Sequence, residues 1–182
     1  MNGEYFCVHG GISTKLETLD QVNQIERFQE PGDDECLFND LLWADPMKRK
    51  FCRMYEEFRN RERGISVNFS LRVLEGFLER NQLKALIRAH EQKYCGHKFH
   101  LWRGEDKDPP CITIFSAPNY CQHRNLGAVL VFKNQGEKAQ VLTYSQHQHN
   151  YFMRLQDWED PDFDSDRPRY SDDPSIITVS YQ

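Results

Sequence analysis

The chain of 182 residues has no apolar run that approaches the length of about eighteen residues needed for a membrane-spanning helix. Its N-terminus lacks a basic segment followed by a long apolar stretch, so no signal peptide is predicted. The net charge of -5 and the absence of a basic stripe exclude a general attraction to nucleic acid. We therefore expect neither a membrane nor a nucleic-acid partner.

The six cysteines lack the regular spacing of a disulfide framework, and Cys7 and Cys111 lie inside apolar runs. Reduced thiols in the cytosol or the nucleus fit this pattern best, so we expect a cytoplasmic or nuclear location. The short basic segment Met47-Lys48-Arg49-Lys50 is interpreted as a solvated helix start rather than a ligand site. No internal repeat is present, and the length suits one domain with a core.

Short apolar runs bounded by turn residues predict strands. They lie at 4–8, 84–89, 98–102, 111–116, 127–133 and 139–144. Asn134-Gln135-Gly136 predicts a hairpin between the last two. A helical region is expected from 18 to 62, in which Phe51, Met54, Tyr55 and Phe58 have amphipathic spacing. Ser70 predicts the N-cap of a further helix, with a buried face formed by Leu71, Leu74, Phe77 and Leu78.

Residues 157–182 are expected to form an acidic, flexible tail. Eight acidic residues and only two arginines lie between Asp157 and Asp173. Such a composition disfavours a packed core. The closing Ile176-Ile177-Thr178-Val179 predicts a short strand or a docking motif.

Three of the strand-like runs stop at residues that can bind ions or phosphate. These are His9-Gly10-Gly11, His90-Glu91 and Ser116-Ala117-Pro118-Asn119-Tyr120. Sites in α/β proteins tend to lie at the C-terminal ends of strands. Two imidazoles can bind a transition metal, but they do not make a complete hydrolytic centre.

Five blocks of sequence resemble the phosphoprotein phosphatases, the serine/threonine phosphatase family that includes calcineurin. In the family's order they are Phe6-Cys7-Val8-His9-Gly10-Gly11-Ile12-Ser13, Leu41-Leu42-Trp43-Ala44-Asp45-Pro46, Arg63-Gly64-Ile65-Ser66, Ile87-Arg88-Ala89-His90-Glu91 and Ser116-Ala117-Pro118-Asn119-Tyr120. The segment between Pro46 and Arg63, with Tyr151-Phe152-Met153 and Trp158, is more similar to the calcineurin branch. The resemblance implies an α/β (α+β) fold, a metallophosphoesterase β-sandwich flanked by helices, of which residues 1–156 would form about the C-terminal half.

The family's other blocks, GDxHG, GDxxDRG and GNHE, do not occur in this sequence. In the family they supply a bridging aspartate, an asparagine ligand, a second phosphate-binding arginine and the general-acid histidine. We therefore expect this chain alone to be inactive. Because the partner sheet would also be largely missing, we expect the inward face of the strands at 111–116, 127–133 and 139–144 to be partly exposed.

By resemblance, His9 and His90 bind the same one of two metal ions, which would be manganese, iron or zinc. In this chain at most one ion would bind, and weakly, because structural and catalytic zinc sites use at least three protein ligands. Arg63 would bind the phosphate through its planar fork of donors, Tyr120 would lie beside it, and Asp45 would support the metals. The alternatives are structural histidines, a surface arginine, a packed loop tyrosine and a turn aspartate.

Some residues depart from the family pattern, and a few others have spacings that resemble a zinc site. Thr14 replaces a usual proline, while His123 and Arg124 stand where relatives usually carry acidic residues. We interpret Cys95, His97 and His100 as structural rather than as a zinc cluster, since only two would share a strand face. His147 and His149 are expected at the surface.

The implied function is a metal-dependent serine/threonine protein phosphatase, a hydrolase in which two metals activate a water against phosphoserine or phosphothreonine proteins. A regulatory subunit is an expected partner. The alternative is a truncated pseudo-phosphatase that acts as an interaction or decoy module. A phosphoesterase for small molecules is a third reading, disfavoured by the blocks around Asp45 and Tyr120.

Overall fold

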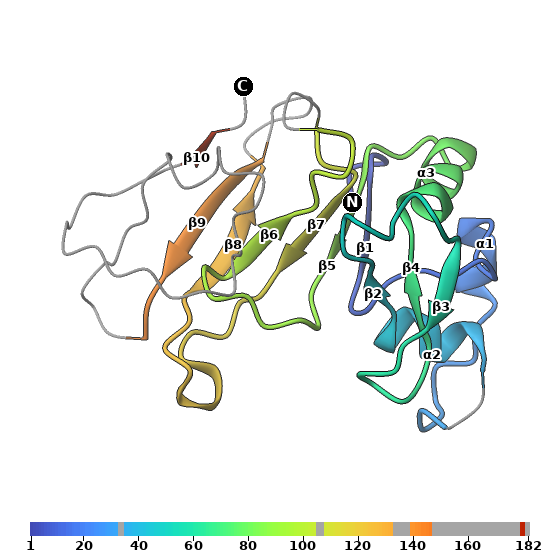
Figure 1. The fold of residues 1–182 in the computed structure, drawn as a ribbon, viewed down its shortest axis with the longest axis horizontal. Coiled ribbons are helices and arrows are strands. Elements are labelled where there is room, and N and C mark those ends of the chain that lie inside the picture. The colour runs from blue at the N-terminus through green and yellow to red at the C-terminus, as the bar shows by residue number, and fades with distance from the viewer. Residues whose placement is uncertain (33–34, 105–107, 133–138, 147–178, 181–182) are drawn as a thin grey trace. The chain divides into compact units, whose positions relative to one another are not determined.

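The computed structural model describes residues 1–32, 35–104, 108–132, 139–146 and 179–180. The chain divides into two compact units (Figure 1). The first unit contains Met1–His90 and His100–Ile112, and the second contains Glu91–Phe99 and Thr113–Gln182. Both contain short strands, and the described helices belong mainly to the first, so the predicted mixed α/β class is confirmed.

Two parallel strands form the centre of the first unit. Strand β1 (Tyr5–Val8) pairs with β5 (Ala85–Arg88) so that Tyr5 lies opposite Ala85 and Val8 opposite Arg88. The backbone N–H of Leu86 donates to the carbonyl of Pro110 at 2.9 Å, which brings the segment before Cys111 beside β5. The two predicted strands are confirmed, and in this register they end level with each other.

A second small sheet in this unit is built around β4 (Val67–Phe69). Strand β2 (Asp45–Pro46) pairs with it in parallel, and β3 (Glu57–Arg59) pairs with it antiparallel. The backbone N–H of Met47 donates to the carbonyl of Phe69 and extends the first pairing. Asp45 is thereby fixed at the start of a buried strand.

Helix α3 (Leu71–Arg80) forms as the sequence predicts. The Ser70 side chain accepts a hydrogen bond from the backbone N–H of Val73, and the four expected apolar residues are buried. Phe77 meets Phe6 of β1 with ring centroids 5.2 Å apart, so the helix packs on the central strands. The other helices are α1 (Leu19–Asn23) and α2 (Leu37–Trp43). In the part of the chain that the structure describes, no helix is both long and apolar enough to cross a bilayer.

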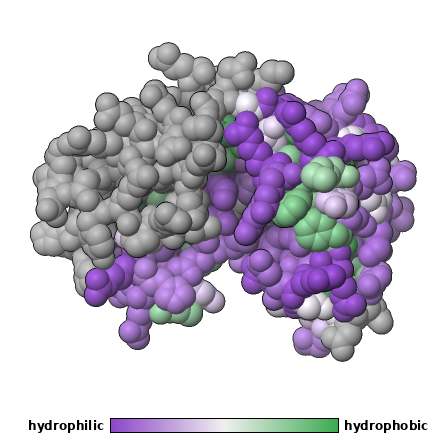
Figure 2. All heavy atoms as spheres, viewed as in Figure 1, coloured by the Kyte–Doolittle hydropathy of each residue, from purple (hydrophilic) through white to green (hydrophobic). Residues whose placement is uncertain are grey.

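The helix predicted around residues 51–58 is wrong, and most of the region 18–62 is not helical. Residues 47–56 form turns, and Glu57–Arg59 is strand β3. Met54 is 70% exposed. Figure 2 shows apolar side chains at the surface of the first unit, in the same view as Figure 1. Instead of forming one face of a helix, the aromatic rings contact one another, with Phe58 edge-on to both Phe51 and Tyr55. Pairing of β3 with β4 outweighs the local helical pattern.

The second unit consists mainly of strands. It contains β6 (His97–Phe99), the end of β7 (Cys111–Ile114), the 3₁₀ turn η1 (Tyr120–Gln122), β8 (Gly127–Val131) and β9 (Gln140–Tyr144). Strands β8 and β9 are antiparallel as predicted, while their connecting turn lies outside the described residues. Val129 and Leu142 lie opposite each other and are both partly exposed.

The C-terminal residues contribute one more strand to this unit. Strand β10 (Val179–Ser180) pairs antiparallel with β9, with Val179 opposite Val141. The expected strand at 176–179 is therefore present at Val179. The rest of the acidic tail, with His147 and His149, lies outside the described residues, so the predictions for it stay predictions.

Two glycines give opposite predictions for the same substitution. A Cβ at Gly10 would lie 2.6 Å from both the Leu42 carbonyl oxygen and the Trp43 nitrogen, whereas a Cβ at Gly76, inside α3, would meet nothing within 4 Å. Gly10→Ala should lower the free energy of unfolding by about 1–3 kcal/mol or more. Gly76→Ala should raise it by up to about 1 kcal/mol. Urea unfolding measures both, and shifts of the same sign would contradict the packing described here.

Candidate active site

His9 and His90 lie side by side although 81 residues separate them. Strands β1 and β5 end level, and the backbone N–H of Ala89 donates to the carbonyl of His9 at 3.0 Å. The His9 Nε2 atom lies 3.0 Å from the His90 Nδ1 atom, and the ring centroids are 4.9 Å apart. The parallel register thus delivers one imidazole from each strand to the same place.

The backbone around both histidines is tightly constrained. The Gly10 N–H donates to the Leu41 carbonyl at 2.8 Å, and a Cβ at Gly11 would overlap the Phe69 ring. His90 has a φ of 61°, a left-handed conformation that is uncommon outside glycine. Such conformations persist where the surroundings impose them, often at functional sites. The packing therefore holds both imidazoles in place.

Both imidazoles are kept neutral at pH 7. Burial lowers the pKa of His9, and the positive charges of Arg88 and Arg63 lower it further. Burial and the charge of Arg63 lower the pKa of His90 to about 4. Neutral imidazole is the form that binds metal ions. The pair is therefore in the ligand form over the physiological pH range.

The facing nitrogens of the pair lie at hydrogen-bond distance, which is also near the spacing of two ligands of one metal ion. Bonds of 2.0–2.1 Å to a tetrahedral zinc ion would place two ligand nitrogens about 3.3 Å apart, close to the observed separation. The other nitrogen of His90, Nε2, is buried and has no hydrogen-bond partner among the described residues. No group of three or more His, Cys, Asp or Glu that could hold a metal occurs in the described part of the chain. The residues present thus fit two ligands of an ion, not a complete shell.

Asp45 is a buried carboxylate that holds three neighbouring side chains. Its Oδ2 accepts from Arg63 Nε at 3.0 Å and from Asn60 Nδ2 at 2.8 Å, and its Oδ1 accepts from Arg88 Nη2 at 2.8 Å. Burial alone would raise its pKa, but Arg88, Arg63 and Asn60 outweigh burial, and the pKa of Asp45 is lowered. Asp45 is therefore ionised, and its oxygens are occupied by donors rather than free to bind a metal.

Arg63 is anchored at one nitrogen and open at the others. Asp45 accepts from its Nε, and the Asn60 Oδ1 accepts from its backbone N–H at 3.2 Å. Among the described residues no acceptor bonds to its two terminal nitrogens. The side chain is 31% exposed, and its charge lowers the pKa of both histidines, so it lies near them. Its free fork can therefore receive an anion beside the imidazole pair.

Arg88 is one of two residues of this cluster whose role sequence reasoning missed. It is 1% exposed, and its Nε donates to the Gly10 carbonyl at 2.5 Å while Nη2 donates to Ala44 at 3.1 Å and to Asp45. The sequence did contain an indication, because Arg88 directly follows the apolar run Ala85-Leu86-Ile87. A charged side chain at the end of a buried strand needs a buried partner. Asn60, which carried no such signal, was missed as well.

Tyr120 belongs to the second unit. Its ring meets Phe115 edge-on with centroids 5.3 Å apart, its backbone N–H donates to Asn125 Oδ1 at 2.9 Å, and half of it is exposed. Its predicted position beside the phosphate and Arg63 stays a prediction. His97 makes a local contact, because its Nδ1 lies 3.0 Å from the Cys95 carbonyl oxygen. Burial lowers the pKa of His97 to about 4.

The departure at Thr14 has a structural explanation. The backbone N–H of Thr14 donates to Glu57 Oε2 at 2.7 Å, and its hydroxyl donates to Oε1 at 2.8 Å. A proline at this position would lack both donors. The threonine thus connects the segment after the histidine turn to β3.

We predict that Asp45→Asn strongly destabilises the chain. The substitution removes the charge that compensates the buried Arg88, and breaking a buried pair in this way costs about 3–5 kcal/mol. Glu56→Gln is the matched control, since Glu56 pairs with Arg72 at 3.5 Å where both side chains are mostly exposed; such pairs contribute at most about 1 kcal/mol. Urea unfolding of both variants is the measurement, and equal losses would show that Asp45 has no special structural role.

The family model described as calcineurin-like phosphoesterase matches residues 1–94. Serine/threonine-protein phosphatase 2B catalytic subunit A1 of Saccharomyces cerevisiae is 37% identical over 173 residues, which cover 88% of this chain and 31% of that protein. Serine/threonine-protein phosphatase 5 of Arabidopsis thaliana is 36% identical over 169 residues, covering 85% of this chain and 28% of that protein. The chain thus spans about a third of the length of these curated relatives.

A solved structure supports the same relationship. It is a protein serine/threonine phosphatase from Saccharomyces cerevisiae with similarity to human phosphatase PP5, and it superposes with a TM-score of 0.64 at 29% identity. The match covers 82% of this chain and 46% of that one. The family match extends over more than half of the sequence and includes His9, Arg63 and His90. The chain therefore belongs to the calcineurin-like phosphoesterase family, and its relatives are serine/threonine protein phosphatases.

Proposed function

We propose that this chain is part of the catalytic domain of a metal-dependent serine/threonine protein phosphatase. The observation that supports it most is the approach of His9 Nε2 to His90 Nδ1 at 3.0 Å, with Arg63 anchored nearby through Asp45. The arrangement combines two neutral imidazoles, which can bind a metal, with the positively charged guanidinium group of Arg63. Those are two of the elements that hydrolysis of a phosphate monoester needs.

Each residue has a separate role in this proposal. His9 and His90 would hold one metal ion through the facing nitrogens. When bound, the ion would supply an activated water and offset negative charge on the phosphoryl oxygens. Arg63 would bind the phosphate with its two terminal nitrogens, while Asp45 holds its Nε and so fixes the direction of the fork. Asp45 is thus a positioning residue.

The relatives support a proposal for the substrate class. Those described above are named serine/threonine protein phosphatases, so phosphoserine and phosphothreonine proteins are the proposed substrates of the whole domain. We propose manganese, iron or zinc as its metals, a regulatory subunit as a partner and the cytosol or nucleus as its location. Tyr120 would contribute beside the phosphate.

One prediction from this proposal concerns metal binding by the imidazole pair. His9→Ala and His90→Ala should each weaken zinc binding by about tenfold or more, since even the loss of an outer partner of a ligand costs 10–100-fold. His123→Ala is the matched control, because this histidine lies in the second unit and bonds to Gln92. Isothermal titration with zinc measures the affinities. If all three variants bind zinc equally well, the pair is not a metal site.

Another prediction from this proposal concerns catalysis. This chain of 182 residues should not hydrolyse a phosphoserine peptide or an aryl phosphate above background, even with added manganese. The described site supplies two imidazoles and one open arginine, and the sequence contains none of the blocks GDxHG, GDxxDRG and GNHE. Release of inorganic phosphate is the measurement. Turnover that depends on metal and disappears in His90→Ala would contradict this expectation.

A further inference from the structure

A second group of charged side chains surrounds a pocket in the first unit that shares no residue with the histidine site. The pocket has a volume of about 450 Å³, which lies in the range of small-ligand sites. Its lining residues come from the loop after β2, the first turns of α3 and the segment after β6. They are Cys52, Arg53, Leu71, Arg72, Glu75 and Arg103.

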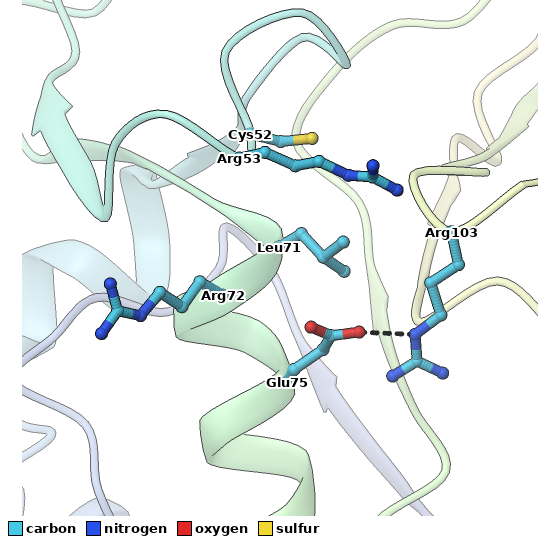
Figure 3. A pocket seen from close by; sticks show the side chains of 6 residues that line it. All are labelled: Cys52, Arg53, Leu71, Arg72, Glu75 and Arg103. Carbon is cyan, nitrogen blue, oxygen red and sulfur yellow. Dashed lines mark hydrogen bonds and ion pairs between the residues drawn. The ribbon is translucent and has the colours of Figure 1, made fainter.

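Arg103 is held at one nitrogen and open at the others. Its Nε donates to Glu75 Oε1 at 2.7 Å, and the two side chains are only about one-third exposed. No acceptor among the described residues bonds to its terminal nitrogens. Figure 3 shows Glu75 and Arg103 joined beside the open space, with Leu71 facing it. Glu75 therefore fixes the guanidinium without using its fork.

Arg53 provides a second guanidinium on the same pocket. Its Nη2 donates to the Trp102 carbonyl at 3.3 Å, which leaves its other nitrogens without an acceptor in the described part of the chain. In Figure 3 it extends toward Arg103 from the loop after β2. Arg72 points away and pairs with Glu56 at 3.5 Å, so its charge contributes less.

One segment that contributes to the pocket is basic in sequence, in a protein whose net charge is -5. The segment 47–55 carries Lys48, Arg49, Lys50 and Arg53 and no acidic residue. The sequence suggested a solvated helix start there, but the structure forms turns that bring Arg53 to the pocket. Leu71 and Arg72 begin a ten-residue helix, whose dipole favours an anion at that end.

We propose that this pocket binds a phosphate dianion through the guanidinium groups of Arg53 and Arg103. Guanidinium forks match the oxygens of phosphate and form charge-assisted hydrogen bonds with them. The phosphate can be free inorganic phosphate or the phosphate of a phosphorylated residue in a protein segment. Glu75 orients Arg103 and, being negative, limits the affinity. The proposal does not depend on the function assigned to the histidine site.

The test uses the whole chain and follows the arginine Nε–Hε signals by NMR during titration with inorganic phosphate. A second titration uses a phosphoserine peptide, with the unphosphorylated peptide and chloride at equal ionic strength as blanks. Signals of Arg53 and Arg103 should move together. Arg53→Ala and Arg103→Ala should each weaken binding at this pocket about tenfold or more. Arg80→Ala, at the other end of α3, should leave it unchanged.

Glu75→Gln supplies a test of the opposite sign. It removes the competing negative charge, while the amide oxygen introduced at this position can still accept from the Arg103 Nε and orient the guanidinium. Phosphate should therefore bind this pocket several-fold more tightly, whereas a pocket that binds no anion gives no change in the titration. Tighter binding of the phosphoserine peptide than of inorganic phosphate would identify a protein segment as the source, and the reverse would identify free phosphate.

Two results would overturn the proposal: the Arg53 and Arg103 signals stay still, or Glu75→Gln does not tighten binding. Arg53→Lys and Arg103→Lys replace the alanine variants if those fail to fold, and should also weaken binding, because lysine lacks the fork. Repeating the titration in Arg63→Ala separates the two sites, since loss of phosphate binding at Arg63 alone should leave the signals of this pocket moving as before.

Discussion

Arg88 at the end of β5 reaches Asp45 at the start of β2, and this buried ion pair joins the two sheets of the first unit. The same guanidinium donates to the carbonyl of Gly10, in the turn that follows His9. Three parts of the chain therefore meet at one charged group that is 1% exposed. A charge in such a place is stable only when its partners are all present, so the geometry of the histidine turn, β2 and β5 is determined together.

The pair also sets the electrostatics of the candidate site. Asp45 is ionised because two arginines and Asn60 surround it, and its negative charge in turn holds Arg63 by its Nε. Arg88 and Arg63 add positive charge near the imidazoles and help to keep them neutral. One buried cluster thus keeps the imidazoles of His9 and His90 neutral and orients Arg63, whose terminal nitrogens stay available near them. A phosphate and a metal ion both suit that combination.

Much of this could be predicted from the sequence where a local pattern carried the information. The apolar runs before His9 and His90 predicted strands, and parallel strands deliver their ends to one edge, so the approach of the two imidazoles followed. The Ser70 cap and the buried face of α3 were equally local. The helix around residues 51–58 failed because its amphipathic spacing was correct but the pairing of β3 with β4 was stronger. The link between Asp45 and Arg88 depends on contacts 43 residues apart, which no local pattern reveals.

X-ray absorption at the zinc edge of the metal-loaded chain tests the central claim most directly, because it counts imidazole ligands and measures their distance from the metal. The arrangement of His9 and His90 predicts two histidine nitrogens at about 2.0–2.1 Å from one zinc ion, reduced to one in His90→Ala. A spectrum with no histidine nitrogen, or one that is unchanged in His90→Ala, would contradict the account, because the two facing imidazoles would then be a structural contact only.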